Sequence, residues 1–182
     1  VQPLLMKFDA TYDFLDHDGD RFWFRTDKDA PRGCVIALDR TDPGAPFCTI
    51  APQDGDALHG ARILGGHLVC HYLTDASSRI VVRALDGTVK STLALPALGS
   101  VGPFSGKASD PVAYCTFQSF VHAPTVLRHD LTTGVTDVLP QGRPGFDASK
   151  LVTERRFLQS PDGTRLCLFV VHRKGLRLDG SH

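Results

Sequence analysis

Two histidines flank a cysteine in the stretch His67–Asp75, and imidazole and thiolate groups are ligands that zinc prefers. The stretch mixes apolar and polar residues at a period near two, which predicts a β-strand. On a strand, His67 and His71 lie on one face with Val69 between them, and Cys70 lies on the other. This pattern favours polar and packing positions on a half-buried strand over metal ligation.

The stretch Asp16–Asp20 carries three carboxylates within five residues, a density that could bind calcium. An EF-hand calcium loop places glycine at its sixth position and a bidentate glutamate at its twelfth. Here Gly19 is fourth, and the twelfth position is Asp27, which lies beyond an expected strand. The pattern therefore favours a hairpin turn over a calcium site.

A serine nucleophile of the hydrolase type needs the pattern G-x-S-x-G, which holds the serine on a sharp turn between a strand and a helix. The nearest stretches, Gly99–Gly102 and Gly102–Gly106, both depart from that pattern. We therefore expect Ser100 and Ser105 to be loop serines. We assign no catalytic, substrate-binding, cofactor-binding or metal-binding residue in this chain, and we expect no cofactor.

The charges of the 182 residues balance, with 20 Lys and Arg against 20 Asp and Glu. This balance argues against a broad basic surface for nucleic acid or an anionic membrane. Small basic clusters occur at Arg155–Arg156 and at Arg173–Lys174 with Arg177, but no Gly-rich phosphate cradle accompanies them. We expect these clusters to be solvated faces or contacts with a missing domain. No apolar run approaches the roughly 20 residues that a membrane span needs.

The five cysteines are odd in number, widely spaced and without a C-x-x-C pair: Cys34, Cys48, Cys70, Cys115 and Cys167. This usage predicts buried, reduced thiols in a cytoplasmic protein. The N-terminus has no basic region followed by an apolar run of signal-peptide length. It also has no initiator methionine, so we expect the sequence to begin within a longer chain.

Short runs of strand-forming residues return in three rounds of four. The expected strands are 11–15, 21–26, 34–38 and 47–50, then 58–64, 67–73, 80–85 and 89–95, then 101–104, 112–117, 125–128 and 135–139. The aspartates after the third strands, Asp39, Asp86 and Asp130, recur at intervals of 47 and 44 residues. Four short strands per period of about 40–50 residues are typical of a β-propeller blade. A β-sandwich fits the strand spacing but does not explain the repeat.

We therefore predict an all-β chain with a partial β-propeller of about three blades, approximately residues 9–50, 57–96 and 99–140. Gln141–Gly145 breaks the repeat and resembles a linker. A hairpin of a different kind follows, with strands 152–158 and 165–172 around the turn Ser160–Gly163. Its apolar second strand leads into a polar ending, which predicts the start of a second domain.

The C-terminal stretches resemble the prolyl oligopeptidase family, in particular its prolyl endopeptidase branch, over nearly the whole chain. The C-terminal motifs are Ser160–Thr164, Leu166–Val171, His172–Leu176 and Leu178–His182. The upstream motifs, in the same order as in the family, are Tyr12–Phe14 with Gly19, Phe24–Thr26, Asp39 with Thr41–Pro43, Val69–Leu73, Gly99–Val101 with Ser105–Gly106, and Phe146–Ser149.

The resemblance implies a cytoplasmic two-domain serine endopeptidase that cleaves short peptides after proline. Its seven-bladed propeller would cover an α/β-hydrolase domain that holds a Ser–Asp–His triad. Residues 1–146 would supply about three of the later blades, and residues 147–182 the first hairpin of the hydrolase domain. No triad or proline-pocket position falls within this chain, so the chain alone is expected to be inactive. Its implied partners are peptide substrates, the remaining blades and the peptidase domain.

An alternative from another class is a stand-alone propeller that binds a peptide or protein without catalysis. The hairpin distinguishes the two hypotheses. A stand-alone propeller should end by closing a blade, whereas this chain continues through a Pro–Asp–Gly hairpin into an apolar strand. The hairpin therefore favours the peptidase hypothesis.

Overall fold

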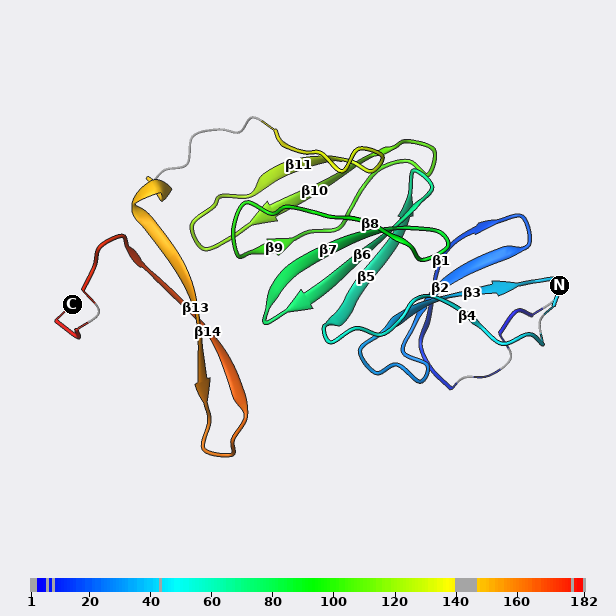
Figure 1. Ribbon diagram of the computed structural model, residues 1–182, viewed down its shortest axis with the longest axis horizontal. Helices are drawn as coiled ribbons and strands as arrows, with labels where there is room; N and C mark the ends of the chain where they lie inside the picture. The colour runs from blue at the N-terminus through cyan, green and yellow to red at the C-terminus, as the bar shows by residue number, and fades with distance from the viewer. Residues whose placement is uncertain are drawn as a thin grey trace.

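The computed structural model describes residues 3–5, 7, 9–42, 44–139, 147–177 and 179–181. They form three four-stranded antiparallel sheets and a separate two-stranded hairpin (Figure 1). Each sheet is built from four consecutive strands paired in sequence order. This repeat confirms the predicted all-β propeller segment. The predicted linker Gln141–Gly145, Phe146 and the terminal His182 lie outside the described residues.

We name the three sheets blades 1, 2 and 3 in chain order. Blade 1 contains β1 (Tyr12–Asp18), β2 (Arg21–Thr26), β3 (Cys34–Asp39) and β4 (Cys48–Ala51). Blade 2 contains β5 (Ala57–Leu64), β6 (His67–Thr74), β7 (Ser77–Ala84) and β8 (Val89–Thr92). Blade 3 contains β9 (Ser100–Val101), β10 (Val112–Gln118), β11 (Thr125–Asp130) and β12 (Thr136–Val138).

The hairpin consists of β13 (Leu151–Gln159) and β14 (Arg165–Arg173), preceded by the 3-10 turn η1 (Ala148–Lys150). Its register runs without a break from the Leu151–Arg173 pair to the Gln159–Arg165 pair. Figure 1 shows the hairpin beside the ends of the blade 2 strands rather than stacked on a blade face. No helix in the described part of the chain is long and apolar enough to cross a membrane.

Blade 2 is buried on both faces because it lies between the other two blades. From β6, Leu68, Cys70 and Tyr72 join an apolar cluster with residues of blade 1. Val69, which points the other way, joins a second cluster with residues of blade 3. This double burial explains why β6 carries a continuous apolar run instead of a strict alternation.

The outer faces of the two terminal blades are less well covered. On blade 1, a third cluster around Phe24 and Ile36 is buried partly by the N-terminal residues Leu4 and Leu5. On blade 3, Tyr114 of β10, which faces away from blade 2, keeps 38% of its surface exposed. In a propeller, faces of this kind receive the neighbouring blade.

Several strand boundaries differ from the sequence prediction. β7 begins at Ser77 and not at Ile80, because Asp75 and Ala76 alone make the turn after β6. Both turn residues have positive φ angles, 47° and 60°, as a tight two-residue hairpin turn requires. β9 is only Ser100–Val101, since the residues after it leave the ladder and make a single bridge from Ser105 to Tyr114.

The cysteines are all free in the structure, and three of them are buried. Burial raises the pKa of Cys70 and of Cys115 to about 11, so both are thiols at neutral pH. The expectation of burial is wrong for Cys48, which is exposed at the start of an outer strand, and only partly right for Cys167.

Candidate functional site

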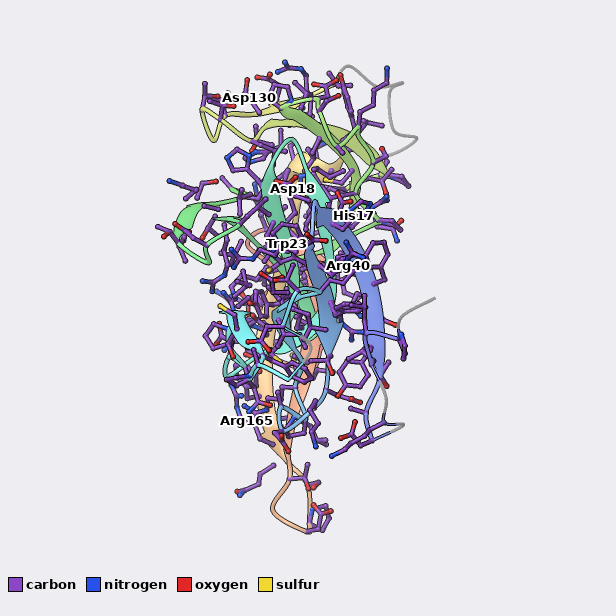
Figure 2. All side chains as sticks on the ribbon, turned by 90° about the vertical axis from the view of Figure 1, so that its right-hand side faces the viewer. His17, Asp18, Trp23, Arg40, Asp130 and Arg165 are labelled. Atoms are coloured by element: carbon purple, nitrogen blue, oxygen red, sulfur yellow. The ribbon has the colours of Figure 1, made fainter. Side chains whose placement is uncertain are left out.

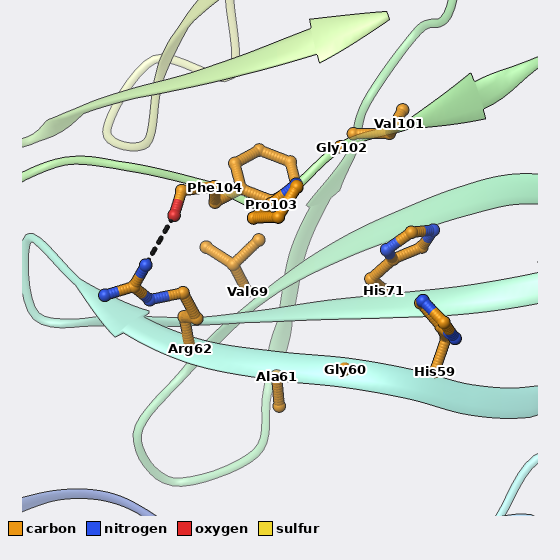
Figure 3. A pocket seen from close by; sticks show the side chains of 10 residues that line it. All are labelled: His59, Gly60, Ala61, Arg62, Val69, His71, Val101, Gly102, Pro103 and Phe104. Carbon is orange, nitrogen blue, oxygen red and sulfur yellow. Dashed lines mark hydrogen bonds between the residues drawn. The ribbon is translucent and has the colours of Figure 1, made fainter.

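A cavity of about 230 Å³ lies between blades 2 and 3 (Figure 3). His59 and Arg62 of β5, Val69 and His71 of β6, and the segment 101–104 line it. Val69 and His71 face the cavity while Cys70 packs toward blade 1, which confirms the predicted alternation of this strand.

A β-bulge brings His59 beside His71. The pairing of β5 with β6 shifts between Leu58 and Gly60, so His59 has no partner of its own in the ladder. The two imidazole rings lie 5.0 Å apart between centroids, nearly perpendicular at 75° (Figure 3). His59 was not among the residues singled out from the sequence, although a glycine directly after it, within an expected strand, is a recognised sign of a bulge.

His71 is tied to the neighbouring blade through a serine. Its Nε2 lies 2.8 Å from Oγ of Ser78 on β7, and the same oxygen accepts the backbone N–H of Val101 at 2.8 Å. Burial, with a smaller contribution from the nearby His59, lowers the pKa of His71 to about 4. His71 is therefore neutral at pH 7 and acts as a hydrogen-bonding group between the blades.

The cavity does not contain a complete catalytic or metal site. Arg62 donates from Nη1 to the carbonyl of Phe104 at 2.7 Å, so its charge is used in joining the two blades. His67 lies apart from the pair, with Nδ1 2.8 Å from the carbonyl of Gly65. Two imidazoles supply fewer ligands than a closed zinc site needs, and no group of three or more metal-binding side chains occurs among the described residues.

The pKa of His71 predicts a stability that depends on pH. In the unfolded chain a histidine titrates near pH 6.5, and in the fold His71 titrates near 4, so the unfolded state binds more protons between these values. We expect stability to fall by roughly 1–2 kcal/mol as pH drops from 7 to 4.5, after discounting for the partial exposure of the ring.

Urea unfolding at both pH values tests this expectation, with His71→Gln as the comparison. Glutamine can still hydrogen-bond to Ser78 but cannot titrate. Subtracting its pH dependence from that of the wild type removes the contributions of the other titrating groups. Equal pH dependence in the two proteins would contradict the proposed role of His71.

The carboxylates of Asp16–Asp20 belong to no group of three or more metal-binding side chains in the described part of the chain. Gly19 and Asp20 form the two-residue turn between β1 and β2, which confirms the predicted hairpin turn. Asp20 is paired with Arg40, whose Nε and Nη2 both donate to its Oδ1, at 2.8 and 2.5 Å. Figure 2 labels His17, Asp18 and Arg40 in this region. Asp20 is thus already paired with a guanidinium.

The two candidate serines are not arranged for nucleophilic catalysis. Ser105 donates from Oγ to the carbonyl of Tyr114 at 3.4 Å. Ser100 belongs to the short strand β9, so its prediction as a loop residue is wrong. Ser119 does lie beside a histidine, with Oγ 3.2 Å from Nδ1 of His122, but the same oxygen accepts two backbone N–H groups of its own turn. It is therefore a turn-forming residue.

A second candidate region is the contact between the hairpin and blade 2. Arg165 of β14 and Arg155 of β13 approach the carboxylate of Asp75 in the β6–β7 turn, at 3.1 and 3.7 Å. Figure 2 shows Arg165 at the end of the molecule opposite Asp130. From the sequence, Arg155–Arg156 are expected to be solvated or to face a missing domain. That expectation is wrong for Arg155, which contacts blade 2, while Arg156 pairs with Glu154 of its own strand.

The hairpin also approaches blade 3. Phe169 of β14 lies against Phe120 of the β10–β11 loop, with ring centroids 5.5 Å apart. A cavity of about 390 Å³ lies between these two rings, the turn residue Ala76, Ser77 of β7 and the segment 98–100. The hairpin thus meets the blades at two points with open space between them.

These features define a segment of a β-propeller with a hairpin attached at one end of its blades. The chain belongs to the prolyl oligopeptidase family: the sequence model described as "Prolyl oligopeptidase, N-terminal beta-propeller domain" matches residues 1–141.

Relatives and solved structures agree with this assignment. The prolyl endopeptidase of Elizabethkingia meningoseptica is 26% identical over 181 residues, which are 99% of this chain and 26% of that protein. Dipeptidyl aminopeptidase BI of Pseudoxanthomonas mexicana is 30% identical over 175 residues, 91% of this chain and 24% of that protein. A solved prolyl endopeptidase structure is 32% identical, with a TM-score of 0.85 over 96% of this chain and 26% of its own. The chain thus spans about a quarter of the length of these relatives.

Proposed function

We propose that this chain is the propeller-to-peptidase junction of a serine endopeptidase that cleaves short peptides after proline. The observation that carries the proposal is that the similarity to prolyl endopeptidases continues past the propeller and through the hairpin, over 99% of the chain. A stand-alone propeller that binds proteins would not need this hairpin.

In this proposal, residues 1–146 form part of the propeller and residues 147–182 begin the α/β-hydrolase domain. The catalytic Ser–Asp–His triad lies outside the 182 residues, in agreement with the absence of a G-x-S-x-G pattern from them. The propeller segment forms part of the wall that restricts access to the catalytic serine. Its partners are the remaining blades, the peptidase domain and, through the whole enzyme, peptide substrates. We propose a cytoplasmic location, in keeping with its free cysteines.

The proposal predicts a sharp difference between the whole protein and this segment. The full-length protein is expected to hydrolyse a chromogenic amide of a short peptide ending in proline, and a serine-directed inhibitor is expected to abolish this activity. The 182-residue chain is expected to show no turnover, because it lacks the nucleophile.

A matched peptide amide with alanine in place of proline is the control for specificity. Binding of the proline peptide by the full-length protein without any hydrolysis would favour the stand-alone binding module. Inhibitor-sensitive hydrolysis by the 182-residue chain itself would overturn the placement of the triad.

A further inference from the structure

The β6–β7 turn holds Ala76 in a backbone conformation that alanine does not favour. Asp75 and Ala76 are both left-handed, with φ angles of 47° and 60°, where hairpins usually place Asn–Gly. Such strain persists where surrounding contacts fix the conformation, and it directs attention to function. Among the described residues that are not glycine, Asp29 in blade 1 is the other one with a positive φ, 51°.

The hairpin holds this turn from several sides at once. The Nη1 of Arg165 lies 3.1 Å from Oδ1 of Asp75, and the Nη1 of Arg155 lies 3.7 Å from Oδ2. The backbone is held too: Arg155 donates to the carbonyl of Thr74 at 3.2 Å, and the thiol of Cys167 to the carbonyl of Asp75 at 3.4 Å. These contacts join residues 81 to 92 positions apart in the sequence.

The hairpin residues that make these contacts share one face. The register pairs Arg155 with Phe169 and Phe157 with Cys167, so their side chains alternate onto the same side as that of Arg165. The guanidinium of Arg165 lies 3.5 Å from the ring centre of Phe157, which fixes its direction. The hairpin therefore presents an ordered cationic face to a single carboxylate.

Both partners of the longer approach, Arg155 and Asp75, are partly withdrawn from water. The side chains of Asp75 and Arg155 are 28% and 26% exposed. A partly buried ion pair is screened by salt less than a fully exposed one, and losing one partner leaves the other charge unpaired. Arg165, at 61% exposed, is the more solvated of the two cations.

We propose that Asp75 is the positioning residue that holds the hairpin at a fixed angle to the propeller. Resting on the proposed function, the inference extends to the whole enzyme, because the hairpin begins the peptidase domain there. Asp75 would then set how closely the two domains meet and so how large a peptide can enter. The open space between the turn and the Phe120–Phe169 contact leaves room for the hairpin to tilt when the Asp75 contact is released.

Hydrogen–deuterium exchange on the full-length protein tests the contact itself, using Asp75→Asn. Asparagine keeps the size and the left-handed preference of the turn residue but removes the charge. We expect exchange of the hairpin amides 165–169 to rise about three- to tenfold, the effect of losing one charge-assisted hydrogen bond, with the melting temperature little changed.

Asp29→Asn is the matched control. Asp29 has the same residue type and a similar φ, but its carboxylate makes a long 3.7 Å approach to the adjacent Lys28, and its side chain is 86% exposed. Asp29→Asn should leave exchange at the hairpin unchanged.

Arg165→Gln should raise hairpin exchange as Asp75→Asn does, and the double variant should raise it by less than the product of the two single effects. The proposal would be overturned if hairpin exchange were equal in Asp75→Asn and Asp29→Asn. It would also be overturned if the increase in exchange in the double variant equalled the product of the increases in its two single variants.

Kinetics on proline-containing peptides of two lengths test the consequence for the enzyme. In Asp75→Asn, kcat/KM for a peptide of about 30 residues should rise severalfold relative to that for a tetrapeptide. A ratio that stays constant would show that Asp75 does not control access. If the full-length protein hydrolyses neither peptide, the proposed function fails, whereas the exchange experiment still decides the role of Asp75.

Discussion

Replacing Phe117 with alanine is expected to lower the free energy of unfolding by about 3–5 kcal/mol. Phe117 is fully buried in the apolar cluster that joins blades 2 and 3. Its ring also lies against the backbone at Gly99, where an added Cβ would come within 2.8 Å of the ring. The substitution therefore removes a large side chain from a site whose walls belong to two segments of the chain, and neither can collapse freely.

Urea unfolding followed by circular dichroism and by the fluorescence of Trp23 measures this loss. Trp23 is the single tryptophan of the chain and lies in blade 1, so a shared midpoint for the two signals would show that the blades unfold together. Phe120→Ala is the control, because this phenylalanine is 63% exposed and its loss should cost less than about 1 kcal/mol. A loss below about 1 kcal/mol for Phe117→Ala would contradict the described interface.

The second large effect is expected from Gly65→Ala in the β5–β6 turn. Gly65 has a φ of 52°, and a Cβ added there would lie 2.6 Å from the carbonyl oxygen of Asp110 and 2.9 Å from Cα of Pro111. Both of these are backbone atoms of the segment that leads into β10 within blade 3, so relieving the collision requires the two blades to separate. We expect a loss of roughly 2–4 kcal/mol, from overpacking added to left-handed strain.

The adjacent Gly66 supplies a matched control. It also has a positive φ, 70°, but a Cβ added there meets nothing within 4 Å. Gly66→Ala should therefore cost only the strain of about 1–2 kcal/mol, and the difference between the two variants reports the contact between the blades. Equal losses for the two variants would show that the turn does not press against blade 3.

The repeat of four strands could be predicted from the sequence because it depends on local patterns. Turn residues such as Gly19 stop the strands, and apolar runs such as Val69–Cys70 mark positions that neighbouring blades bury on both faces. The predicted strand boundaries were wrong where a tight turn used fewer residues than expected. The Asp75–Ala76 turn is the clearest case, because neither residue is the glycine or asparagine that usually marks a left-handed position.

The candidate sites were less predictable because they depend on contacts between distant residues. His59 reaches His71 only through a bulge, which changes the register by one residue and leaves a weak sequence signal. Arg155 and its partner Thr74 lie 81 residues apart, and no local pattern connects them. The family resemblance indicated that a domain begins at the hairpin, but it did not indicate which residue of the propeller would hold it.

The positions of the cysteines allow the opening of the blade interfaces to be followed by chemical labelling. Cys70 lies in the cluster between blades 1 and 2, and Cys115 lies in the cluster between blades 2 and 3. Neither thiol can meet an alkylating reagent until its own interface separates, whereas Cys48 on the surface is accessible from the start. The order in which Cys70 and Cys115 become labelled during gentle denaturation would thus show which of the two blade interfaces opens first.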